Sequence, residues 1–140
     1  MLGSVVKLKN VIFKTCHGEK RCYIDRARLK GRPAIVICET EDRIYHLLIT
    51  HHDFQTLIEK RDYELPNDIG VDGFVKLNEI HSRPLCYEEE LNIIPDELMV
   101  DILSRFCQYQ ELTDMDEQYE EIRPYVYKKV CDLSRKYEKR

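Results

Sequence analysis

An arginine, a threonine and two histidines lie at the ends of two apolar segments. Arg32 precedes the run Pro33-Ala34-Ile35-Val36-Ile37-Cys38, Thr50 ends the next segment, and His51 and His52 follow it directly. Arginine offers a planar fork that matches a phosphate, and histidine is the commonest general acid or base near neutral pH. Cleavage of an RNA phosphodiester needs a proton acceptor for the 2′-hydroxyl, a cation beside the phosphate and a proton donor for the leaving oxygen. The four residue types therefore indicate an RNA-cleaving site.

A β-hairpin must position these residues. The apolar run after Arg32 is too short for a helix and predicts a strand that is buried on both faces. A polar turn centred on Thr40-Glu41 joins it to a second strand over residues 43–50.

The register of this hairpin decides whether the residues meet. A turn centred on Thr40-Glu41 places Arg32 opposite Ile49 or Thr50, and directly opposed Cβ atoms lie about 5 Å apart. We therefore expect Arg32 and Thr50 at the same end of the hairpin. A shift of one residue would place their side chains on opposite faces of the sheet.

The rest of the chain predicts short strands followed by helices. We expect further strands at residues 4–9, 11–13, 22–24, 63–65 and 74–77, and strand pieces on either side of Arg83-Pro84. Helices are predicted at 53–60, from Pro95-Asp96-Glu97 onward and at 114–137, where Pro124 should kink or split the last one. The fold class is α+β, mainly β: a small, strongly bent sheet or barrel with C-terminal helices.

Composition and hydropathy limit the classes of protein to which this chain can belong. The chain has 140 residues, 43% hydrophobic and 34% charged, which is typical of one globular domain. No apolar run approaches the roughly 20 residues that a membrane helix needs, and the N-terminus shows no signal-peptide pattern, so we expect a cytoplasmic protein.

Residues 1–32 carry nine lysines and arginines against two acidic residues, although the whole chain has a net charge of −4. This basic block indicates a surface that faces a polyanion.

The six cysteines do not predict a metal site. Cys16 and Cys22 lie closest together, but no second pair has matching spacing, so we expect no metal and no other cofactor. Without an export signal, most of these cysteines are interpreted as reduced, half-buried residues.

Four segments, in order, resemble the MazF/PemK (Kid) family of toxin endoribonucleases. The first two are Lys30-Gly31-Arg32-Pro33-Ala34-Ile35-Val36-Ile37 and Leu47-Leu48-Ile49-Thr50, similar to a G-x-R-P strand and a strand that ends in threonine. The other two are Asp72-Gly73-Phe74-Val75-Lys76-Leu77-Asn78-Glu79-Ile80 and Ile93-Ile94-Pro95-Asp96-Glu97-Leu98-Met99. Together they cover roughly residues 3–110.

The resemblance implies a fold and an activity. The fold would be an SH3-like barrel of five to seven strands, here the domain 1–112 with its terminal helix, followed by a helical extension over 113–140. The activity would be metal-independent cleavage of single-stranded RNA at short sequences, which leaves a cyclic phosphate and a 5′-hydroxyl. The resemblance also implies a homodimer and a cognate antitoxin that blocks the site. Arg32 would stabilise the charged phosphate and Thr50 would hydrogen-bond to it.

The chain departs from the family pattern at histidines. His51 stands where the family has serine or threonine, and His81-Ser82-Arg83-Pro84 replaces an Arg-Thr-[Ile/Leu]-Asp segment, so His81 occupies the position of an arginine that contacts RNA. We therefore take Arg32, Thr50 and His51 as catalytic. The residues expected to contact RNA are Lys20, Arg21, Arg28, Lys30, His52, His81 and Arg83.

Two other functions fit the same residues. The barrel could be a non-catalytic module that binds a protein or nucleic acid through its basic loop, with catalysis lost at residues 81–84. It could also be a toxin that acts on a topoisomerase, which would not need Arg32. Dependence of RNA cleavage on Arg32 separates the ribonuclease from both.

Overall fold

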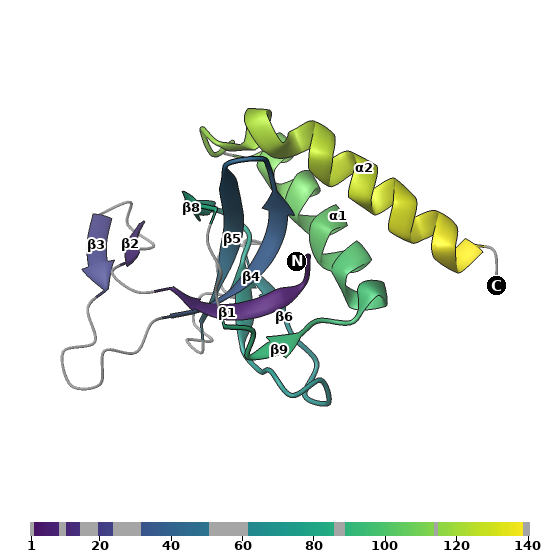
Figure 1. Cartoon of the computed structure of the whole chain (residues 1–140), viewed down its shortest axis with the longest axis horizontal. Coiled ribbons are helices and arrows are strands. Elements are labelled where there is room, and N and C mark those ends of the chain that lie inside the picture. Colours follow the sequence, from purple (N-terminus) through teal and green to yellow (C-terminus); the bar gives the residue numbers. More distant parts are fainter. Residues whose placement is uncertain are drawn as a thin grey trace.

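The computed structural model describes residues 2–8, 11–14, 20–23, 32–50, 62–85, 89–113 and 115–138. Within these ranges the chain forms nine strands and then two helices (Figure 1). The strands are β1 (Ser4–Leu8), β2 (Val11–Lys14), β3 (Lys20–Tyr23), β4 (Arg32–Glu39), β5 (Arg43–Thr50), β6 (Asp62–Glu64), β7 (Phe74–Lys76), β8 (His81–Pro84) and β9 (Asn92–Ile93), and the helices are α1 (Asp96–Leu112) and α2 (Tyr119–Glu138). The predicted class, α+β and mainly β, is confirmed.

In the described part of the chain, seven strands form one antiparallel sheet in the order β6-β7-β5-β4-β1-β9, with β8 also paired to β5. Strand β5 is its centre. One edge of β5 pairs with β4, while the other pairs with β8 through residues 43–46 and with β7 through Ile49 and Thr50. Strands β2 and β3 pair with each other in a separate two-stranded sheet, and β3 includes residues 22 and 23 of the strand expected at 22–24.

The sheet has two different faces. One face packs against the helices in a core that includes Ile35, Leu47, Val75 and Phe106. Both helices lie on this side of the sheet in Figure 1. The other face carries a smaller apolar cluster: Val6, Leu8, Ala34, Val36, Ile44 and Leu48. Strand β4 supplies apolar residues to both faces, as its uninterrupted apolar run predicts.

The C-terminal helix belongs to the same core. Tyr119, Ile122 and Val126 of α2 are fully buried there, and Tyr119 packs edge-on against Phe106 of α1. Lys136 near the end of α2 forms an ion pair with Asp96 at the start of α1, so the two helices run antiparallel. Pro124 does not split the helix, because it lies in the second turn of α2 and removes only one early hydrogen bond.

A polar network fixes the turn between the helices to the sheet. The side chain of Gln110 donates to the Leu77 carbonyl at 2.7 Å, and its oxygen accepts from the backbone of Asp116 at 2.6 Å. Gln118 donates to the Ile80 carbonyl at 2.8 Å and accepts from the Ser82 hydroxyl at 2.7 Å. The helix turn therefore positions the chain segment that leads into β8.

Strand pieces were expected on either side of Arg83-Pro84, but β8 runs through both residues because it pairs with the first half of β5. The helix expected at residues 53–60 lies outside the described residues.

Candidate functional site

A β-bulge decides the register of the central hairpin. Glu39 and Cys38 pair with Ile44 and Tyr45, but after the extra residue Ile37 the ladder continues as Val36 with His46 and Ala34 with Leu48. Continued by two residues, this register sets Arg32 across from Thr50. Of the two partners expected for Arg32 from the sequence, the structure favours Thr50.

The same face of the sheet therefore carries both side chains. Ala34 and Leu48 lie on the face opposite the helices, and Arg32 and Thr50 follow two residues further along each strand. Arg32 is half-buried at the start of β4, where it pairs with Leu8 of β1. Thr50 is 3% exposed. A phosphate held here would meet a guanidinium and a hydroxyl from neighbouring strands.

On its other side, Thr50 meets strand β7. Thr50 pairs with Phe74, a half-buried aromatic residue on the same face. Gly73 precedes it with a φ of +119°, and a Cβ placed on Gly73 would lie 2.6 Å from the carbonyl oxygen of Thr50. Glycine is required at this point, both for the backbone conformation and for the close approach.

Asp62 and Lys76 are buried on this face and were missed in the sequence. They are cross-strand partners in β6 and β7 and are 8% and 6% exposed. The sequence does hold a signal for Lys76, since it lies between the apolar residues Val75 and Leu77. In a strand, this alternation places the lysine on the face opposite the core.

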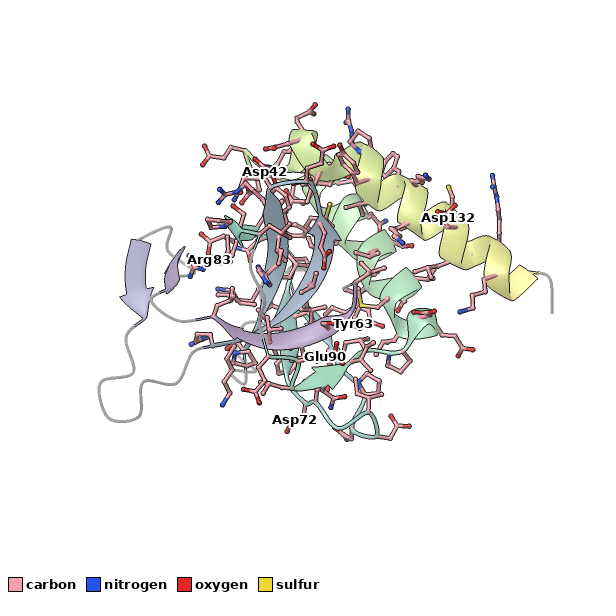
Figure 2. The ribbon with its side chains drawn as sticks, in the orientation of Figure 1. Asp42, Tyr63, Asp72, Arg83, Glu90 and Asp132 are labelled. Atoms are coloured by element: carbon pink, nitrogen blue, oxygen red, sulfur yellow. The ribbon has the colours of Figure 1, made fainter. Side chains whose placement is uncertain are left out.

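His81 and Arg83 lie on the same face but further along β5. They pair with His46 and Ile44, and His46 is fully buried. Thr50 lies four residue steps after His46 in the strand, a distance of roughly 13–14 Å at about 3.4 Å per step. The register therefore sets Arg32 and Thr50 at the same end of the hairpin and His81 and Arg83 further along the sheet. Figure 2 shows Arg83 on the side of the strands away from α2, which Asp132 marks.

A carboxylate orients His81. Its Nε2 lies 3.1 Å from Oε1 of Glu79, and the two side chains are 10% and 12% exposed. This contact leaves Nδ1 of His81 as the ring atom for another partner.

Two of the remaining predicted site residues belong to β3, and four lie outside the described ranges. His51, His52, Arg28 and Lys30 lie outside the described residues. Lys20 and Arg21 belong to β3, where Lys20 pairs with Lys14 and Arg21 with Phe13.

The buried cysteines are unsuited to nucleophilic chemistry. Burial, and then the charges of Glu39 and Glu121, raise the pKa of Cys38 to about 11. Burial also raises the pKa of Cys107. Both thiols stay protonated near neutral pH, and the thiolate is the reactive form.

Within the described ranges, no three residues of the types histidine, cysteine, aspartate and glutamate group closely enough to hold a metal ion. No described helix is long and apolar enough to cross a membrane.

Comparisons with known proteins identify the fold. No family model and no curated protein matches the sequence. A MazE-MazF crystal structure from Deinococcus radiodurans matches with a TM-score of 0.50 and 18% identity, covering 79% of this chain and 95% of that one. This chain has a MazF-type fold. A structure of MazF from the same organism matches equally well, with a TM-score of 0.50, 18% identity, and coverage of 76% and 92% of the two chains. The MazF-type fold agrees with the resemblance found in the sequence.

Proposed function

We propose that this protein is a sequence-specific, metal-independent endoribonuclease toxin that cleaves single-stranded RNA. The observation that carries the proposal is the shared face of Arg32 and Thr50 on the β4–β5 hairpin of a MazF-type fold. These are the positions where the resemblance implies the catalytic arginine and threonine.

The proposed reaction is an internal transesterification. The 2′-oxygen attacks the phosphorus and the bond to the 5′-oxygen breaks, which gives a 2′,3′-cyclic phosphate and a 5′-hydroxyl. Arg32 stabilises the negative charge that builds on the phosphate oxygens, and it is the proposed proton donor to the leaving 5′-oxygen. Thr50 donates a hydrogen bond to the phosphate. His51 follows Thr50 in the sequence and is the proposed acceptor of the 2′-hydroxyl proton.

The proposal includes partners. One of the matched structures is a MazE-MazF complex, and we infer that this chain also binds an antitoxin protein and forms a homodimer in the cytoplasm. Lys20, Arg21, Arg28, Lys30, His52, His81 and Arg83 remain the proposed RNA contacts.

Cleavage of defined RNAs tests the proposal. The purified protein is incubated with EDTA and a set of single-stranded RNAs, and the ends of the products are identified. Discrete fragments with cyclic phosphate and 5′-hydroxyl ends, lost in Arg32→Ala, are expected. Intact RNA across a set that contains all short sequences would overturn the proposal.

A second function is favoured by one observation. Thr50 is 3% exposed, and a catalytic hydroxyl must come within hydrogen-bond distance of the phosphate. A non-catalytic module that binds a protein or nucleic acid is therefore the alternative. Binding of RNA without cleavage, with affinity that falls as salt rises, would support this function.

A further inference from the structure

The pair Asp62 and Lys76 is an unusual feature of the β6–β7 ribbon. The two residues oppose each other in the ladder, and both have less than a tenth of their surface exposed. Directly opposed side chains have Cβ atoms about 5 Å apart, so the two side chains are neighbours on one face of the sheet. Burial of an ammonium group is unfavourable, and an apolar pair of similar size would often be at least as stable. Stability alone therefore does not account for this lysine.

Lys76 lies on the same face of the sheet as Thr50, in the neighbouring strand β7. Ile49 pairs with Val75 in the core, so Thr50 and Phe74 face the opposite side of the sheet. Lys76 is two residues after Phe74 and shares that side, which makes it a diagonal neighbour of Thr50. Diagonal neighbours have Cβ atoms about 7–8 Å apart, within reach of a long side chain.

Two cationic residues therefore share the face of Thr50 on the strands that neighbour β5. Arg32 approaches from β4 on one side, and Lys76 approaches from β7 on the other. A phosphate that accepts a hydrogen bond from Thr50 would lie between them. In poorly solvated surroundings, a second positive charge stabilises the developing charge on the phosphate oxygens more strongly than it would in water.

We propose that Lys76 is a further catalytic residue of this site, a second cation on the scissile phosphate. This inference rests on the proposed ribonuclease function. Lys76 contacts a non-bridging phosphate oxygen in this arrangement.

The test compares four variants with the wild type by single-turnover RNA cleavage. Lys76→Met removes the charge at similar volume, and Lys76→Arg keeps it. Asp62→Asn with Lys76→Met removes both charges, so that no carboxylate is left buried alone. Lys128→Met is the matched control, because Lys128 is exposed on α2 and away from this face.

The expected results separate catalysis from folding. Lys76→Met should slow cleavage by about 10²–10³-fold, the effect of losing one preorganised charge-stabilising donor. Lys76→Arg should recover much of that loss. The double variant should fold with a wild-type circular dichroism spectrum and stay as slow as Lys76→Met. Lys128→Met should cleave at the wild-type rate.

Binding provides a second readout. The slope of log affinity against log salt, measured with an RNA that carries a 2′-deoxy block, should fall by about 0.7 in Lys76→Met, since one phosphate contact is lost. Wild-type cleavage by the folded double variant would overturn the role of Lys76 and leave the proposed function standing. A wild-type protein that cleaves no RNA would overturn both.

Discussion

Arg32 and Thr50 lie on one face of the sheet because β4 carries one extra residue, Ile37, between its two paired blocks. Near the turn, Glu39 opposes Ile44, and that register without a bulge would set Arg32 across from position 51. Thr50 would then point to the other face, since a shift of one residue reverses every side chain. Ile37 itself is fully buried in the core. The bulge residue is therefore part of the core, and the shift in register that it introduces sets the two proposed catalytic residues on one face.

Substitutions at these two residues test the alignment. Arg32→Ala should abolish RNA cleavage, and Arg32→Lys should recover only part of it, because lysine keeps the charge without the planar fork. Thr50→Val has nearly the same shape but lacks the hydroxyl, and should slow cleavage by about 10²–10³-fold. Rates are measured in single-turnover assays, with Thr40→Val in the hairpin turn as the control. Rapid cleavage by Arg32→Ala would exclude Arg32 from the chemistry.

Gly73 is expected to be intolerant of substitution. Its φ of +119° disfavours side chains, and an added Cβ would meet the Thr50 carbonyl oxygen at 2.6 Å. Gly73→Ala should lower the free energy of unfolding by roughly 1–3 kcal/mol, measured by urea denaturation, and should also slow cleavage because it displaces Thr50. Glu64→Ala on the neighbouring strand, which is exposed, should change neither. Unchanged stability of Gly73→Ala would show that β7 can move away from β5.

Much of the fold was predictable because its signals are local. The apolar run after Arg32, the polar turn and the returning strand over 43–50 together predict the hairpin, and Pro95 followed by two acidic residues predicts the start of α1. The stripe on α2 recurs at helical spacing, so its burial against a core could be expected.

The site was less predictable because it depends on pairing between distant strands. Residues 35–38 are all apolar, so nothing local shows which one is the bulge. The position of Lys76 relative to the site follows only from the pairing of β7 with two other strands. These are β6, which carries Asp62, and β5, which carries Thr50. The position of His81 depends on the pairing of β8 with the first half of β5, and this pairing sets His81 apart from Thr50.

Alkaline pH should destabilise the protein. Burial, together with the nearby charge of Glu121, raises the pKa of Tyr45 to about 12, and the pKa of Cys38 is raised to about 11. In the unfolded chain these groups lose their protons at lower pH, near 10 and 9. The unfolded state therefore binds fewer protons than the folded state above pH 9, and stability falls as pH rises, by up to about 1.4 kcal/mol per pH unit for each group.

Urea denaturation between pH 8 and 11 measures this loss. Cys38→Ala should flatten the decline between about pH 9 and 11, while Cys131→Ala, at an exposed cysteine, should leave it unchanged. A stability that stays constant up to pH 11 would contradict the burial of these groups.

The amide network at the helix turn should contribute to stability. Gln110 is fully buried, and its side chain bonds both Leu77 and Asp116. Gln110→Leu keeps the approximate volume but leaves a buried carbonyl and a backbone N–H without partners, which should cost about 1–3 kcal/mol. Gln108→Leu on the exposed side of α1 is the control, and both variants are compared by urea denaturation. Equal stability of the two variants would show that water replaces the lost bonds.

His81 should influence which RNA is cleaved more than how fast it is cleaved. The position is roughly 13–14 Å along the sheet from Thr50, too far to reach the same phosphate, and Glu79 holds the ring through Nε2. His81→Ala should therefore keep cleavage of the best substrate within about tenfold of the wild-type rate and change the preference among flanking nucleotides. Glu79→Gln should produce a weaker change of the same kind. Competition among a randomised pool of RNAs, followed by sequencing of the cleaved ends, measures the preference. Loss of all cleavage in a folded His81→Ala variant would contradict this prediction and place His81 at the scissile phosphate.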